Sequence, residues 1–310
     1  MIIDKLMDRI IELKNPLCVE LNTTLDDIPP EMMITGIQER WKTPSAAKYL
    51  LSKYNAEVID VIKDLVSIVS VPIAPYIQYG SMGLDAFRYT ISTAKINDLM
   101  IIADVRVGDR QEFSRLYVES YLDELTIDDI VHPGHDVDFL TVNPYCGMDS
   151  IGGFMDACKK FDKGLFVIAK TFNELGFNLQ EMRVITPEQP TAGTPIYQEV
   201  LKYIQSSSEH LSAGKYNIRP IGAIVEVDHP HQLGLLRKWF RSMLFLTSFQ
   251  RRVEDTIAAF RDEDKLGGLV RHPFIVKAHK DSTYQGMDWK SSIRQAVLDA
   301  QKTLRLCLSL

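Results

Sequence analysis

The chain has 310 residues, of which 45% are hydrophobic and 25% are charged, and its formal net charge is -6 at pH 7. This length and composition are typical of a globular protein with a full-sized core. The acidic balance leaves no basic excess for a phosphate backbone, so we expect no nucleic-acid partner.

The first segment, residues 1–15, has apolar residues at helical spacing between charged ones, which predicts an amphipathic helix and not a signal peptide. No apolar run reaches the roughly 18 to 20 residues that a membrane span needs. The cysteines are widely spaced, without a CxxC pair or a zinc-site cluster, which predicts reduced thiols. We therefore expect a cytoplasmic protein with no membrane segment.

Short apolar runs rich in Val, Ile and Leu alternate with longer charged segments of helical pattern, which is typical of parallel βα units. Eight such runs occur, at residues 17–22, 67–74, 98–106, 138–143, 164–170, 220–227, 243–248 and 267–271. Eight units predict a (β/α)8 TIM barrel, with residues 1–310 forming a single domain. Segment 183–196, which holds three prolines, is predicted to be an irregular excursion between the fifth and sixth strands.

The third run ends in IIADVRVGDR, where an apolar strand gives way to Asp104, Arg106 and Asp109. Residues two apart in a strand share a face, so we expect Asp104 and Arg106 to point into the barrel mouth, with Asp109 just beyond. Strand carboxyl ends converge on one cavity in this fold, which makes these residues a candidate site. An ion pair that only fills the top of the barrel explains the same spacing.

Almost from end to end, the sequence resembles the orotidine 5'-phosphate decarboxylases, in particular their longer bacterial branch. The resemblance is carried by MIIDKLMDRIIELKNPLCVELN, DLVSIVSVPIAPYIQYGSMGLDAF, DFLTVNPYCGMDSIGGF, GLFVIAKTFNELGFNLQ and YQGMDWKSSIRQAVLDAQKTLR. It implies a homodimeric barrel that converts orotidine monophosphate to uridine monophosphate and carbon dioxide without a metal or organic cofactor. It also implies the chemistry: a lysine ammonium stabilises the carbanion at C6 of the ring and supplies the proton that ends the reaction.

The residues that the resemblance implies for catalysis are substituted here. An Asp that closes strand one falls on Asn22, and a Lys on strand two falls on Ser70. In the D-x-K-x-x-D motif of strand three, Asp104 and Asp109 are kept, the latter implied to reach the partner's pocket, but the Lys is Arg106. A guanidinium stays charged and is a poor proton donor to carbon, so Arg106 is interpreted as a group that ties the two aspartates together.

The implied ligand-binding positions depart in the same direction. The pyrimidine-recognising Ser of a Thr-Ser-Asn turn is Phe172, followed by Asn173, and the phosphate-clamping Arg after the last strand falls on or near Phe274. The resemblance implies a glycine-rich phosphate loop after strand seven. This sequence keeps the glutamine of that loop, at Gln250, but lacks its glycines. A phosphate could still be bound there or one turn before Phe274, by side chains of Gln250, Arg251, Arg252 and Arg271.

His229 and His231 have a spacing that could place two imidazoles on one metal, but the intervening proline favours a turn, so we expect no metal site.

Three functions remain open from the sequence. The first is a divergent paralogue without the standard decarboxylation, acting as a binding or regulatory protein. The second is a lyase on orotidine monophosphate or a related ligand that uses Arg106, Asp104 and Asp109. The third is a barrel enzyme with a new substrate and one of the two aspartates as acid or base.

Overall fold

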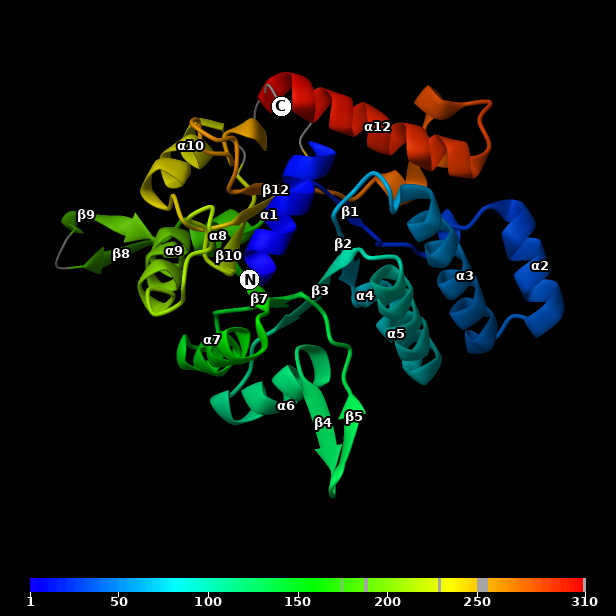
Figure 1. The fold of residues 1–310 in the computed structure, drawn as a ribbon, viewed down its shortest axis with the longest axis horizontal. Coiled ribbons are helices and arrows are strands. Elements are labelled where there is room, and N and C mark those ends of the chain that lie inside the picture. The colour runs from blue at the N-terminus through cyan, green and yellow to red at the C-terminus, as the bar shows by residue number, and fades with distance from the viewer. Residues whose placement is uncertain (174, 187–188, 228–229, 250–255, 309–310) are drawn as a thin grey trace. The chain divides into compact units, whose positions relative to one another are not determined.

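The computed structural model describes residues 1–173, 175–186, 189–227, 230–249 and 256–308 (Figure 1). Eight parallel strands form a closed barrel in the order β1-β12-β11-β10-β7-β6-β3-β2. Their bounds are β1 Leu17–Glu20, β2 Ile68–Pro72, β3 Met100–Val107, β6 Phe139–Val142, β7 Gly164–Lys170, β10 Ile221–Val225, β11 Phe245–Ser248 and β12 Gly268–His272. Each lies within or overlaps one of the eight predicted runs, so the predicted (β/α)8 barrel is confirmed.

The strands form where they were predicted because their side chains are buried on both faces. β2, β6 and β10, for example, are buried at every residue except Pro72. The parallel register aligns Glu20 of β1 with Ser70 of β2, and Pro72 of β2 with Asp104 of β3. Ser70 in turn aligns with Ile102, so Asp104 lies two residues beyond that level on β3. Because side chains two apart in a strand share a face, Glu20, Ser70 and Asp104 lie on one face near the strand carboxyl ends.

Helices connect the strands and cover them. The α-helices whose bounds lie within the described residues are α1 Ile2–Leu13, α2 Pro30–Arg40, α3 Pro44–Ile62, α4 Ala74–Ile77, α5 Gly80–Ile96, α6 Gln111–Tyr121, α7 Asp149–Phe161, α8 Gly176–Gln180, α9 Ile196–Ser207, α10 Pro230–Trp239 and α12 Trp289–Leu308. Short 3-10 helices lie at Leu25–Asp27, Ile275–Lys280 and Ser282–Tyr284. Within the part of the chain that the structure describes, no helix is both long and apolar enough to cross a membrane.

The chain divides into two compact units. One comprises residues 1–7 and 106–270, and the other comprises residues 8–105 and 271–310. β1, β2 and most of β3 belong to the second unit, together with α2 to α5 and α12. β6, β7, β10 and β11 belong to the first, together with α6 to α10. The single-domain organisation stays a prediction.

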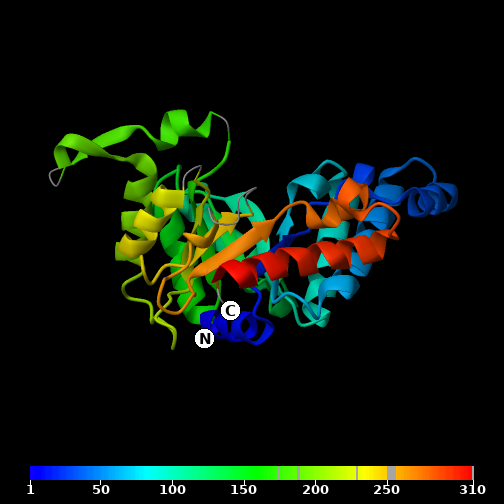
Figure 2. The ribbon, with the colours of Figure 1, turned by 90° about the horizontal axis from the view of Figure 1, so that it is seen from above.

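Two antiparallel hairpins stand outside the barrel sheet. One pairs β4 Glu124–Ile127 with β5 Ile130–Pro133, and the other pairs β8 Arg183–Thr186 with β9 Gln189–Pro195. In Figures 1 and 2 the second hairpin extends away from β7 and β10 of its own unit.

The prediction that segment 183–196 is irregular was therefore wrong, although its position between β7 and β10 was right. Val184 aligns with Thr194 in the ladder. Arg183 Nη1 donates to the carbonyl oxygens of Ala192 (3.0 Å) and Gly193 (2.8 Å), and Gly193 takes a left-handed φ of 62°. The proline-rich composition suggested a loop without regular backbone hydrogen bonds. In the structure, the β-ladder and the Arg183 side chain satisfy the backbone polar groups of this segment.

Arg237, near the end of α10, fixes the starts of two strands in the first unit. It is buried, and its guanidinium donates to the carbonyl oxygens of Met243 (2.9 Å) and Gly267 (2.8 Å), which precede β11 and β12. It also donates to Ala259 (2.7 Å) and Phe240 (2.8 Å). A buried guanidinium that meets this many carbonyls is fully hydrogen-bonded, so it anchors these turns without a carboxylate partner.

Candidate functional site

In the second unit, the barrel interior near the strand carboxyl ends carries an ion network. Arg271 of β12 places Nη1 2.9 Å from Asp104 Oδ2 and 3.5 Å from Glu20 Oε1. The side chains of Arg271 and Asp104 are 6% and 2% exposed, and that of Glu20 is 12% exposed. The Arg271 guanidinium therefore lies between two carboxylates. Because the three side chains are largely shielded from water, each charged group is stabilised by an opposite charge nearby.

Cys18 lies next to this network. Burial raises the pKa of its thiol far above the usual range; the Arg271 charge opposes that shift, and Glu20 and Asp104 add to it. Cys18 precedes Glu20 by two residues in β1 and shares its face. The Cys18 thiol is therefore an inert part of the interior.

Ser70 and Asn22 contribute neutral groups to the same unit. Ser70 is completely buried and is aligned with Glu20, and Asn22 follows Leu21, whose N–H donates to the Ser70 carbonyl oxygen at 2.8 Å. Ser70 Oγ and Asn22 Oδ1 are buried without a hydrogen-bond partner among the described residues. Buried polar atoms in this state are uncommon, and they leave hydrogen-bonding capacity for a ligand or water.

The ion pair on Asp104 is made by Arg271, which the sequence had suggested only as a phosphate ligand. The structure therefore gives Arg271 a second role, as the cation for the kept aspartate of β3. Phe274, the neighbouring position considered for the phosphate-clamping arginine, is 65% exposed.

Arg106 and Asp109 belong to the first unit and are both exposed. Arg106 has a φ of 50°, which breaks the extended conformation at the tip of β3, and its N–H donates to Thr141 Oγ1 at 2.8 Å. Strand alternation therefore does not hold as far as Arg106, which differs from the expectation that it shares a face with buried Asp104. Asp109 Oδ1 accepts from the Arg110 N–H at 2.7 Å. That Arg106 ties the two aspartates together stays a prediction.

Gly108 lets this tip approach the end of β6. A Cβ atom at residue 108 would lie 2.1 Å from the Asn143 carbonyl oxygen, so only glycine fits. The Asn143 N–H donates to the Val107 carbonyl oxygen at 2.7 Å. The glycine of the D-x-R-x-G-D stretch, to which the sequence assigned no role, holds Arg106 and Asp109 in place.

The end of β7 carries an ion pair in the first unit, between a buried lysine and a partly exposed glutamate. Lys170 is buried, its Nζ lies 2.5 Å from Glu181 Oε1, and it also lies 5.1 Å from the centre of the Tyr197 ring. Glu226, just after β10, is buried and accepts from the Ser248 hydroxyl. The sequence analysis missed Lys170, Glu181 and Glu226. Lys170 is the last residue of one predicted apolar run and Glu226 the next-to-last of another, and these positions could have identified them.

Phe172 and Asn173 follow Lys170 on the loop after β7. The Phe172 N–H donates to Glu226 Oε2 at 3.3 Å, and its ring is 38% exposed. Thr171 is clamped by Gln180, which accepts from the Thr171 N–H at 3.1 Å and donates to its Oγ1 at 3.0 Å. Asn173 is exposed, and its carbonyl oxygen accepts from the Gly176 N–H at 2.7 Å. These bonds fix the loop backbone and leave the Phe172 ring and the Asn173 side chain at the surface.

The remaining predicted residues are Gln250, Arg251, Arg252 and His229, which lie outside the described residues. His231 is exposed at the start of α10. The described ranges contain no group of three or more His, Cys, Asp or Glu side chains placed to hold a metal ion.

His272, next to Arg271, makes stability depend on pH. Burial lowers the pKa of its imidazole from 6.5 to about 4, and its Nδ1 accepts from the Phe274 N–H at 3.3 Å, which requires the unprotonated ring. The unfolded chain takes up a proton as the pH falls through 6.5, whereas the folded protein does so only near 4. Stability from this group is therefore present above pH 6.5 and is lost between those values, by roughly 1–3 kcal/mol at the acidic end.

Urea denaturation of the wild type and of His272→Asn, at neutral pH and near pH 4.5, measures this effect. Asparagine keeps an acceptor near Nδ1 but does not titrate, so the variant should lose less stability on acidification than the wild type. Equal losses in the two proteins would contradict the assignment to His272.

Comparison with known proteins gives one consistent result at the level of sequence. The chain is 30% identical over 299 residues to an orotidine 5'-phosphate decarboxylase of Rhodopirellula baltica, covering 93% of each protein. It is 27% identical over 312 residues to a protein of the same name from Clostridium perfringens, covering 96% of this chain and 100% of the relative. A scan against protein-family models found no match.

Solved structures are similar in fold. The OMP decarboxylase of Leishmania donovani aligns with a TM-score of 0.69 at 19% identity, covering 98% of each chain. The orotidine 5'-monophosphate decarboxylase of Plasmodium berghei aligns with a TM-score of 0.76 at 16% identity, covering 99% of each chain. At these identities the likeness concerns the barrel and its helices.

Proposed function

Because the chain belongs to the orotidine 5'-phosphate decarboxylase family, we propose that it binds a nucleotide-like ligand at the strand carboxyl ends without carrying out the standard decarboxylation. The observation that carries this proposal is the state of Asp104. Its carboxylate pairs with the guanidinium of Arg271, while positions 22 and 70, where the resemblance implies Asp and Lys, hold buried neutral groups.

The chemistry of the reaction explains why this arrangement matters. Loss of carbon dioxide leaves a carbanion, and a group that protonates it must have a proton that it can release near neutral pH. A guanidinium keeps its proton, with a pKa above about 12, and is a diffuse planar cation in place of a compact ammonium. Ser70 supplies no charge, and Arg106 and Arg271 both carry guanidinium groups. We therefore propose that none of these three residues donates the proton to the carbanion.

The orphan atoms favour retention of a ligand. Ser70 Oγ and Asn22 Oδ1 are buried and have no partner among the described residues, so a polar ligand in the second unit's barrel end would satisfy them. A nucleotide-like molecule presents suitable donors and acceptors on its base and ribose. The alternative, an altered lyase that uses Arg106, Asp104 and Asp109, is favoured by the burial of Asp104 in an ion pair, since perturbed buried carboxylates are frequent at active sites.

A decarboxylation assay separates the two proposals. Purified protein is incubated with orotidine 5'-phosphate, and the loss of orotate absorbance is followed; we expect none above the uncatalysed background. Thermal-shift measurements with uridine monophosphate are then expected to show a rise in melting temperature, because a ligand specific to the native state stabilises it. If the protein neither decarboxylates orotidine 5'-phosphate nor binds uridine monophosphate, the proposal that it binds a nucleotide-like ligand is wrong.

Arg106→Lys alone is expected not to create family-like turnover. The substitution supplies an ammonium at one position, but Ser70 and Asn22 still lack the charges that the resemblance implies, and Asp104 is still paired with Arg271. The same absorbance assay measures this, with Asp104→Asn as the control for any residual rate. Family-like rates from the single change would show that the other substitutions matter little.

Two further properties are proposed from the family. The protein is a homodimer, with Asp109 near the pocket of the partner subunit, and it is cytoplasmic. Exposure of Asp109 at the tip of β3 is compatible with a role at an interface. Light scattering coupled to size-exclusion chromatography tests the dimer, and a monomeric mass at micromolar concentration would contradict it.

A further inference from the structure

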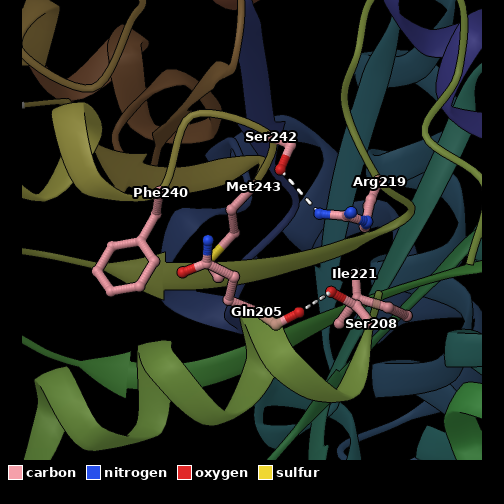
Figure 3. A pocket seen from close by; sticks show the side chains of 7 residues that line it. All are labelled: Gln205, Ser208, Arg219, Ile221, Phe240, Ser242 and Met243. Carbon is pink, nitrogen blue, oxygen red and sulfur yellow. Dashed lines mark hydrogen bonds between the residues drawn. The ribbon is translucent and has the colours of Figure 1, made fainter. Parts of the chain in front are cut away.

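A small cavity lies at the amino ends of β10 and β11, in the first unit. Its volume is about 10 Å3, and Figure 3 shows the side chains that line it. Ile221 is the first residue of β10, Ser242 and Met243 precede β11, and Gln205 belongs to α9. The cavity thus lies at the amino ends of these strands. The proposed nucleotide site lies at strand carboxyl ends and does not involve the cavity.

Arg219 is the charged group of the cavity. Its Nη1 donates to Ser242 Oγ at 2.9 Å, and its backbone N–H donates to the Ser242 carbonyl oxygen at 2.8 Å. Its Nε is buried and has no hydrogen-bond partner among the described residues. Arg219 also forms no ion pair with any described residue. The lining residues include no Asp or Glu. A guanidinium with a buried N–H therefore faces a small space that holds no counter-charge.

Two other polar side chains of the lining, Ser242 and Gln205, can each donate a hydrogen to an anion. Ser242 Oγ accepts from Arg219, so its own hydrogen is left for another acceptor. The Gln205 carboxamide has an NH2 group that forms no hydrogen bond with the described residues. Ser208 is satisfied, because its hydroxyl donates to the Gln205 carbonyl oxygen at 3.1 Å. The unmatched hydrogens at the cavity thus come from three side chains, and one of these carries a positive charge.

We propose that this cavity is a binding site for one monoatomic anion, which is chloride under ordinary solution conditions. Arg219 is half-buried, and an anion at its buried Nε forms a charge-assisted hydrogen bond that satisfies the orphan N–H. A volume of about 10 Å3 has room for one atom-sized occupant and excludes a phosphate or a carboxylic acid. A water molecule would accept the same hydrogen bond but without the attraction between opposite charges. Bound chloride would join α9 to the starts of β10 and β11.

Bromide replaces chloride in such sites and is located by its anomalous scattering. Crystals of the wild-type protein soaked in sodium bromide are expected to show an anomalous peak inside the cavity, next to Arg219 Nε. Crystals in which bromide peaks occur only elsewhere, with ordinary water density in the cavity, would overturn the proposal.

Solution stability gives an independent test. At equal ionic strength, sodium chloride is expected to raise the melting temperature of the wild type by about 2 °C more than sodium gluconate does. Arg219→Met should lose this difference, and Ser242→Ala, which keeps the charge, should reduce it. Arg88→Met, at an exposed arginine of α5, is the matched control and should keep the full difference. A chloride effect of equal size in the wild type and Arg219→Met would overturn the site.

Discussion

Arg271→Met is expected to lower the free energy of unfolding by about 3–5 kcal/mol, because it removes the cation that pairs with buried Asp104 and with Glu20. Asp104 and Glu20 lie 2.9 and 3.5 Å from Arg271 Nη1, and the Asp104 side chain is 2% exposed, so water cannot replace the guanidinium there. Methionine keeps much of the apolar stem, so the change isolates the charge. Urea denaturation at neutral pH measures the effect, provided that the slope of the transition is unchanged.

A double-mutant cycle attributes the loss to the pair. Asp104→Asn/Arg271→Met removes both charges, and its cost should be smaller than the sum of the two single substitutions by about 1–3 kcal/mol. Strict additivity would show that Arg271 and Asp104 do not depend on each other. Such a result would also remove the observation on which the proposed function rests.

Ser70→Lys in the wild-type protein is expected to destabilise it by about 3–5 kcal/mol. Ser70 is completely buried and aligned with Glu20, so a lysine adds both excess volume and a second cation to a level that already holds Arg271. Overpacking alone costs typically about 1–3 kcal/mol, and a like charge in the same interior adds to it. Ser70→Met, which has a similar length and no charge, is the matched control for volume.

The same substitution should be better tolerated when Arg271 is absent. In an Arg271→Met background, the new ammonium can pair with Glu20 and Asp104, so the cost of Ser70→Lys should fall by at least about 1.5 kcal/mol. That outcome is expected if the cation for Asp104 can come from either β2 or β12. If Ser70→Lys costs as much with Arg271 as without it, the two positions do not share one electrostatic role.

The barrel could be predicted from the sequence because its strands are covered on both faces and therefore appear as continuous apolar runs. The strands of the β4/β5 hairpin could not be predicted in this way. β4 and β5 have four residues each and are almost wholly exposed, so neither burial nor an apolar run indicates them. The β8/β9 hairpin was obscured by prolines, which are compatible with the short, exposed strands of a two-stranded ladder.

The candidate site could be predicted only in part. The positions of Asp104, Arg106 and Asp109 at the end of β3 followed from strand order and from the resemblance. The partner of Asp104 did not, because Arg271 is 167 residues away in the sequence and pairing depends on barrel closure. The left-handed φ of Arg106 was also hidden, since nothing in the residue type requires it. Lys170 and Glu226 were missed because they lie at the ends of runs that were interpreted for their apolar residues.

The most direct test of the central claim is release of labelled carbon dioxide from carboxyl-labelled orotidine 5'-phosphate, with protein in excess over substrate. Excess protein makes a single slow turnover visible, which a steady-state absorbance assay would miss. We predict no release above the rate without protein, for the wild type and for Asp104→Asn alike. Release by the wild type that is abolished in Asp104→Asn would contradict the account and would establish this chain as a working decarboxylase.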